Sequence, residues 1–101
     1  MSRPFSYNDE NFTVIGNICF IHLKTIGTIN AGTVLVTIPP AIAERLMQKT
    51  CFSFYQMGEN GMSGGTWDLR IDNNNNIFTN DKIPSGDLVT YFICILILKD
   101  I

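Results

Sequence analysis

The stretch from Leu88 to Leu98 constrains the fold of this chain more than any other segment. Its sequence, LVTYFICILIL, has Thr90 as its only polar interruption and is rich in the β-branched and aromatic residues that favour β-strands. Alternation along a strand puts its residues on two faces, namely Leu88, Thr90, Phe92, Cys94, Leu96 and Leu98 against Val89, Tyr91, Ile93, Ile95 and Ile97. Because both faces are apolar, we expect this strand to be covered on both sides.

The chain is too short to provide many segments that could pack on both faces of this strand. With 101 residues it forms one domain with one modest core. A chain of this size has little material for a second cover, so we expect a partner subunit to supply it. The expected subunit interface is the second face of the strand, made of Tyr91, Ile93, Ile95 and Ile97.

The charge content argues against nucleic acid as a partner. Charged residues make up 16% of the chain and hydrophobic ones 46%, whereas charged residues are about 25% of an average soluble domain. The formal net charge is −2, and the seven Lys and Arg residues form no cluster in the sequence. Binding to phosphates needs several cations on one face, so we expect no DNA or RNA partner.

The cysteines indicate packing rather than metal or redox chemistry. Cys19, Cys51 and Cys94 are far apart and each lies in an apolar run, which predicts small buried side chains. Neither CxxC pairs nor zinc-ligand spacing occurs. The run from Asp72 to Ile83 resembles a calcium loop superficially but lacks its glycine and its final acid. We therefore expect no metal and no cofactor.

The sequence predicts neither export nor membrane insertion. Residues 1–11, MSRPFSYNDEN, lack the apolar core of a signal peptide. The longest apolar run, at the closing strand, is shorter than the ~18–20 residues of a membrane helix and is β-branched. We expect a protein made in the cytoplasm and not exported through a signal peptide.

Turn residues divide the chain into short strands. Residues 1–11 are expected to form an arm, 40–49 a helix of two turns, 58–65 a flexible loop and 72–76 a hairpin tip. The expected strands are 12–15, 18–26, 33–38, 50–57, 66–71, 77–79 and 88–98. Short strands at this spacing predict an all-β domain over residues 12–101, an antiparallel β-sandwich or jelly-roll-like fold with a short helix at 40–49.

Side chains that could act chemically are few. His22 is the only histidine, and with Lys24 it lies on the face of its strand opposite Cys19, Ile21 and Leu23. No reactive Ser or Cys can be placed beside it, so no nucleophilic triad is expected. The Asp residues concentrate at turns, where they commonly cap the backbone. We expect no catalytic residues and no enzymatic activity.

One cluster around the glycine-rich loop is of a kind that can hold a sugar. Trp67, Asp68 and Arg70 follow this loop, and Tyr55 precedes it. Alternation groups Trp67 with Leu69 and Ile71, however, which favours Trp67 as a core residue. Loops at one end of a sandwich are where recognition residues commonly lie. Here that end is expected to collect the loop 58–65 and the start of the Trp67 strand, with the segment 39–49 as a further candidate. The expected ligand-binding residues are therefore Tyr55, Glu59 and Asn60, with Trp67 as a further candidate.

Four segments together resemble a known family. They are Val14 to Asn17, Gly32 to Pro39, the hairpin from Ile71 to Ile77, and Leu88 to Leu98. In this order they resemble the small β-sandwich head domains of bacteriophage tail-fibre, baseplate and receptor-binding proteins. The resemblance covers about Phe12 to Leu98.

The resemblance implies a non-enzymatic structural or adhesion protein of the virion. It implies a homotrimer that attaches to other virion proteins and is located in the virion. Its heads would either bind a host cell-surface saccharide or protein, or simply cap a fibre. An alternative hypothesis is a small non-viral ligand-binding or regulatory β-domain of the cytoplasm. The oligomeric state discriminates between them, because only the first predicts a stable trimer.

Overall fold

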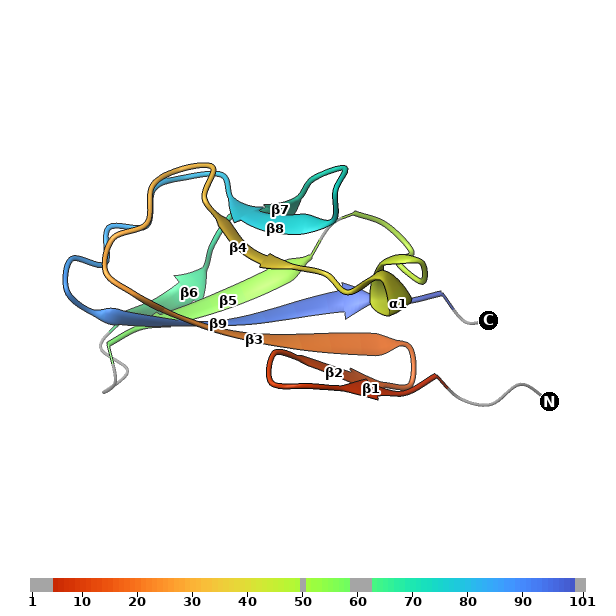
Figure 1. Ribbon diagram of the computed structural model, residues 1–101. Coiled ribbons are helices and arrows are strands. Elements are labelled where there is room, and N and C mark those ends of the chain that lie inside the picture. The colour runs from red at the N-terminus through yellow and green to blue at the C-terminus, as the bar shows by residue number, and fades with distance from the viewer. Residues whose placement is uncertain (1–4, 50, 59–62, 100–101) are drawn as a thin grey trace.

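The strands of the molecule form two antiparallel sheets (Figure 1). The computed structural model describes residues 5–49, 51–58 and 63–99. The larger sheet has the order β1-β2-β3-β9-β5-β6 and the smaller one β4-β8-β7. The elements are β1 (Tyr7–Asn8), β2 (Phe12–Ile15), β3 (Ile18–Ile26), β4 (Val34–Thr37), α1 (Pro40–Ala43), β5 (Phe52–Met57), β6 (Ser63–Thr66), β7 (Leu69–Ile71), β8 (Asn76–Thr79) and β9 (Val89–Ile97). The predicted all-β sandwich with a short helix is confirmed.

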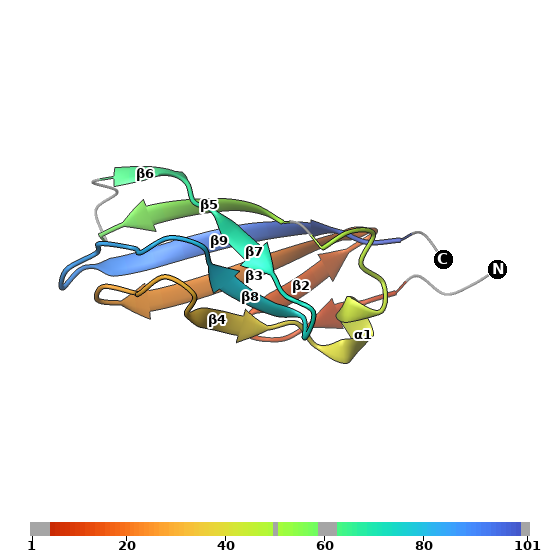
Figure 2. The same cartoon turned by 90° about the horizontal axis from the view of Figure 1, so that it is seen from above.

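Strand β9 lies in the middle of the larger sheet, as expected for the most apolar segment of the chain. It pairs along its full length with β3, from Ile18↔Ile97 to Ile26↔Val89, and on its other side with β5. The smaller sheet lies across one face of the larger one (Figure 2). Only one face of β9 is therefore covered by the described part of this chain.

The core lies between the two sheets. The inward residues of β3 and β9 are those that alternation predicts, and Ile21, Cys94 and Leu96 are fully buried. The smaller sheet adds Leu69, Ile71 and Ile77 from above, and Ile38 and Ile42 close one end. Leu88 departs from the predicted inward set because it precedes β9, and it is 45% exposed.

The hairpin tip between β7 and β8 is held by an aspartate, as predicted. The Asp72 carboxylate accepts hydrogen bonds from the backbone N–H groups of Asn74 (2.8 Å) and Asn76 (2.9 Å), and Asn75 has a φ of 62°. An asparagine tolerates this left-handed conformation better than most residues. The hydrogen bonds from Asn76 and Asn74 stabilise the charged carboxylate, so the pKa of Asp72 is lowered.

The helix is shorter than predicted. A helix of two turns was expected over 40–49, but α1 ends at Ala43 after a single turn. The chain beyond it pairs with the end of β9 instead. The Met47 N–H donates to the Ile97 carbonyl (3.1 Å), and the Lys99 N–H donates to the Arg45 carbonyl (2.7 Å). These inter-segment bonds replace the bonds that a second turn would make. No helix in the described parts of the chain is long and apolar enough to cross a membrane.

Two further segments are more regular than predicted. Within the expected arm, β1 pairs with β2, and the Asp9 carboxylate caps the turn by accepting the N–H groups of Asn11 (2.9 Å) and Phe12 (2.8 Å). These bonds lower the pKa of Asp9. Strand β6 begins within the expected glycine-rich loop, and the loop residues 59–62 lie outside the described residues.

Candidate functional site

The candidate site is the uncovered face of the larger sheet, which we call the outer face. It consists of the outward side chains of β2, β3, β9 and β5. Register brings these side chains into rows across the sheet, since Phe20 and Phe52 flank Ile95, and His22 and Phe54 flank Ile93. The outer face is therefore a continuous surface rather than a set of scattered residues.

Several large apolar side chains of the outer face are exposed. The exposed members are Ile15 (66%), Ile26 (73%), Phe52 (61%), Phe54 (49%) and Ile93 (47%). Single exposed apolar residues are common on protein surfaces, but contiguous patches mark sites of interaction. Here Ile15, Phe52, Phe54 and Ile93 are joined across the sheet by Ile18 and Phe20 of β3, so they form such a patch.

Polar side chains cross the outer face near one of its ends. Lys24 lies over the ring of its cross-strand partner Tyr91, with 5.9 Å between its Nζ atom and the ring centroid. A shallow groove of about 310 Å³ lies here between the β1–β2 turn and β9, and Glu10, His22 and Lys24 are among the residues that line it. His22 lies in the same row as Phe54 and Ile93, and Lys24 lies in the next row, so these polar side chains separate Ile26 from the other exposed apolar residues.

The predicted interface residues all belong to the outer face. Tyr91, Ile93, Ile95 and Ile97 project from the side of β9 that the smaller sheet does not cover, and Ile93 is the most exposed of them. Sequence reasoning did not include Phe20, Phe52 and Phe54. The signal was present in FSF, where alternation puts both phenylalanines on one side, but their nearness to β9 requires the strand pairing.

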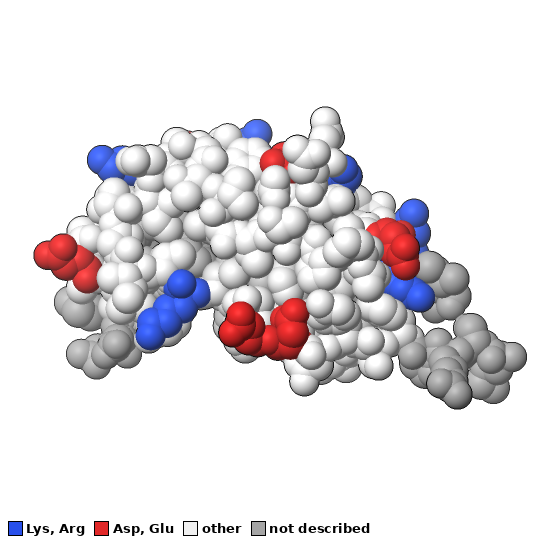
Figure 3. All heavy atoms as spheres, in the orientation of Figure 1, with Lys and Arg blue, Asp and Glu red and all other residues white. Residues whose placement is uncertain are grey.

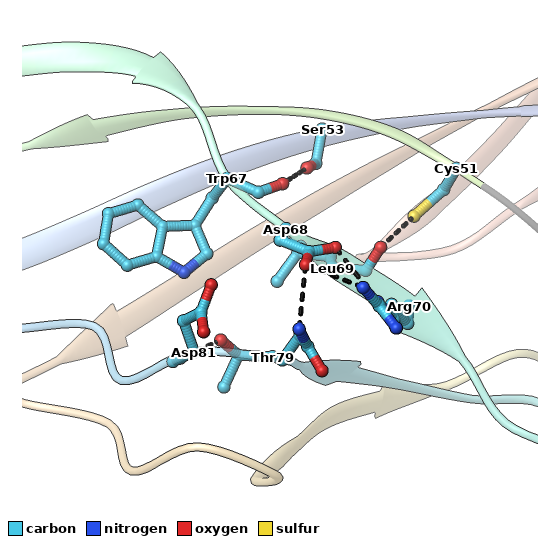
Figure 4. Close-up of polar contacts among 9 residues, drawn as sticks. Cys51, Ser53, Trp67, Asp68, Leu69, Arg70, Thr79 and Asp81 are labelled. Atoms are coloured by element: carbon cyan, nitrogen blue, oxygen red, sulfur yellow. Dashed lines mark hydrogen bonds and ion pairs between the residues drawn. The ribbon is translucent and has the colours of Figure 1, made fainter.

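The predicted ligand-binding aromatics pack against each other. The rings of Tyr55 and Trp67 meet edge to face, with centroids 5.1 Å apart and planes at 88°, and both pack partly buried against the core. Ser53 donates a hydrogen bond to the Trp67 carbonyl, and the buried Trp67 Nε1 has no hydrogen-bond partner within the described chain. Figure 4 shows the indole turned toward Asp81. Trp67 therefore acts mainly as a packing residue, as its alternation with Leu69 indicates.

The polar residues that follow Trp67, Asp68 and Arg70, hydrogen-bond to each other and not to the indole. Arg70 donates two hydrogen bonds to the Asp68 carboxylate (3.2 Å each), and Asn80 donates a third (2.9 Å). The hydrogen bond from Arg70 is the main cause that lowers the pKa of Asp68. In Figure 4 this cluster points away from the indole. The structure does not bring Asp68 and Arg70 together with Trp67 into one sugar site.

The other predicted recognition elements are divided between the two ends of the molecule. Glu59 and Asn60 lie outside the described residues. Gly58 hydrogen-bonds to Val89 at the start of β9, whereas Leu46 bridges to Leu98 beyond its end. The segment 39–49 was expected to share an end with the glycine-rich loop, and this expectation is wrong, because β9 separates them.

The remaining charged and potential metal-binding side chains do not gather at one site. Figure 3 shows the charged side chains in small groups, with wide uncharged surface between the groups on the visible face. Among residues 5–49, 51–58 and 63–99, no three His, Cys, Asp or Glu side chains form a group that could hold a metal ion. Comparisons of the chain with protein-family models, with curated proteins and with solved structures found no match.

Proposed function

We propose that this chain is a non-enzymatic structural and adhesion domain that acts by assembling through its outer face. The resemblance to phage tail-fibre and baseplate head domains suggests that the assembly is a homotrimer in a virion, attached to other virion proteins. The observation that carries the proposal is the contiguous patch of Ile15, Phe52, Phe54 and Ile93 on one side of the larger sheet.

The energetics of covering the outer face are finely balanced. Burying an exposed Phe or Ile contributes about 1.5–3 kcal/mol when it is complete, so the five half-exposed side chains together contribute on the order of 5–8 kcal/mol. Association costs about 4–15 kcal/mol in lost freedom of motion. The two terms are similar in size, so the assembly depends on protein concentration.

Light scattering over a dilution series tests the proposal. We expect a species with three times the 11.3 kDa monomer mass at high concentration, and monomers on dilution. A protein that stays monomeric at every concentration would contradict self-assembly and favour the alternative of a small non-viral ligand-binding β-domain. A stable dimer would support assembly through the outer face but contradict the trimer.

Saccharide binding remains a prediction for the end of the sandwich that carries Tyr55. Trp67 contacts this tyrosine, so its fluorescence reports on the same region. Titration with host-wall saccharides is expected to change that fluorescence in a saturable way. Deletion of residues 61–64, next to Glu59 and Asn60, should abolish the change. Binding that survives the deletion unchanged would place the saccharide elsewhere.

A further inference from the structure

Two of the three cysteines lie on neighbouring segments at the inner side of the larger sheet, and one of them lines a groove. Cys51 precedes β5, and Cys94 lies at the centre of β9 with Ser53 as its direct cross-strand partner. Cys51 lies two residues before Ser53, so its side chain is on the same face of the sheet and it is a diagonal neighbour of Cys94. Such diagonal neighbours have Cα atoms about 7–8 Å apart. The two thiols are close enough for each to shift the pKa of the other.

The two thiols differ in their access to solvent. Cys94 is fully buried, whereas Cys51 is half-buried and lines an open groove of about 230 Å³ together with Trp67 and Asp68. The Cys51 Sγ also donates to the Leu69 carbonyl (3.6 Å), a contact drawn in Figure 4. A small oxidant in the groove can therefore reach Cys51 directly but not Cys94.

The two thiols also differ in acidity. The hydrogen bond from Cys94 lowers the pKa of Cys51, because it stabilises the thiolate. The same hydrogen bond and burial raise the pKa of Cys94. A thiolate is the form that attacks peroxide, and reactive cysteines are accessible ones with a lowered pKa beside a second thiol.

We propose that Cys51 and Cys94 are a redox pair, in which Cys51 is the site of attack on a peroxide and Cys94 the resolving thiol. In the first step the Cys51 thiolate attacks one peroxide oxygen, so the O–O bond breaks, a sulfenic acid forms and hydroxide leaves. In the second step the Cys94 sulfur attacks the Cys51 sulfur, the S–O bond breaks, and the Cys94 proton leaves with the hydroxyl group as water. Each sulfur loses one electron, and the peroxide gains two.

Closing the bond requires a small movement of the chain. A disulfide needs Cα atoms about 4.4–6.8 Å apart, which is slightly less than the spacing of diagonal neighbours. Cys51 can move toward β9 because it lies before the first residue of β5 and outside the strand ladder. The bond would link β5 to β9 on the inner side of the sheet, so it leaves the outer face unchanged.

Peptide mapping of the peroxide-treated native protein tests the pair. Trypsin separates the three cysteines, because Cys51 falls in the peptide 50–70 and Cys94 in 83–99, with Cys19 in neither. We expect hydrogen peroxide to produce a linked species of these two peptides that a reductant removes. A link between Cys19 and Cys94, links between molecules, or Cys51 oxidised to sulfinic acid without any link would each overturn the proposal.

Matched variants separate the two roles. Cys94→Ala removes the resolving thiol, so a sulfenic acid at Cys51 is expected to accumulate and to react with a sulfenic-acid probe. Cys51→Ala should abolish probe labelling, and Cys19→Ala should leave the linked peptide at its native yield. Equal probe labelling of Cys94 in the Cys51→Ala variant would contradict the assignment of the attacked thiol. The native-protein mapping remains decisive if a variant folds poorly.

Discussion

Replacing Phe92 with alanine is expected to lower the free energy of unfolding by about 3–5 kcal/mol. Phe92 is 1% exposed and lies between Leu23 and Tyr55 in the register of the larger sheet. Its removal leaves a cavity in the only core that the described chain forms. Small domains have only about 5–15 kcal/mol of stability in total, so this loss is severe. Urea denaturation followed by circular dichroism measures it.

Phe54→Ala is the matched control for this prediction. Phe54 has the same side chain and lies on a strand next to β9, but it projects from the outer face and is 49% exposed. Measured at a concentration where the protein is monomeric, its replacement should cost about 1 kcal/mol or less. Equal losses in the two variants would mean that the two faces of the larger sheet are equally buried, and the described arrangement of the core would then be wrong.

Replacing Ile95 with aspartate is expected to abolish assembly while leaving the monomer folded. Ile95 lies at the centre of the outer face, between Phe20 and Phe52. In a monomer the new carboxylate can reach water from this face. In an assembly it would be buried among apolar groups without a partner, which costs several kcal/mol. A loss of this size corresponds to at least a hundredfold weaker association.

Light scattering and circular dichroism together measure this second effect. Val34→Asp is the control, because Val34 is a 49% exposed β-branched residue on β4, in the smaller sheet and away from the outer face. It should leave the subunit number unchanged. If Ile95→Asp assembles like the unaltered protein, the outer face is not the contact surface and the proposed mode of assembly fails.

Much of the larger sheet could be predicted from local chemistry. β-Branched and aromatic residues in 18–26 and 88–98 favour strands, and their alternation identifies the inward side chains that are buried in the structure. Asp72 and the asparagines after it indicate a hairpin tip, because short polar side chains stabilise tight turns. These signals act between residues close in sequence, so they can be read without the fold.

Other features depended on contacts between distant segments. The helix at Pro40 stops after one turn because the end of β9 pairs with the chain beyond it, and β1 exists because β2 offers an edge. The nearness of Cys51 to Cys94 likewise follows from the pairing of β5 with β9. A sequence shows neither which strands become neighbours nor which local preference a tertiary contact overrides.

The candidate site shows the same division. The sequence by itself determined that β9 is apolar on both sides. It therefore predicts that the second side, made of Tyr91, Ile93, Ile95 and Ile97, is covered by other protein atoms. Only the tertiary structure decided which side the smaller sheet covers, and that residues from β2, β3 and β5 extend the uncovered side into one patch. The physical reason is that alternation sorts side chains onto two faces within a strand, whereas burial depends on which other segments pack against each face.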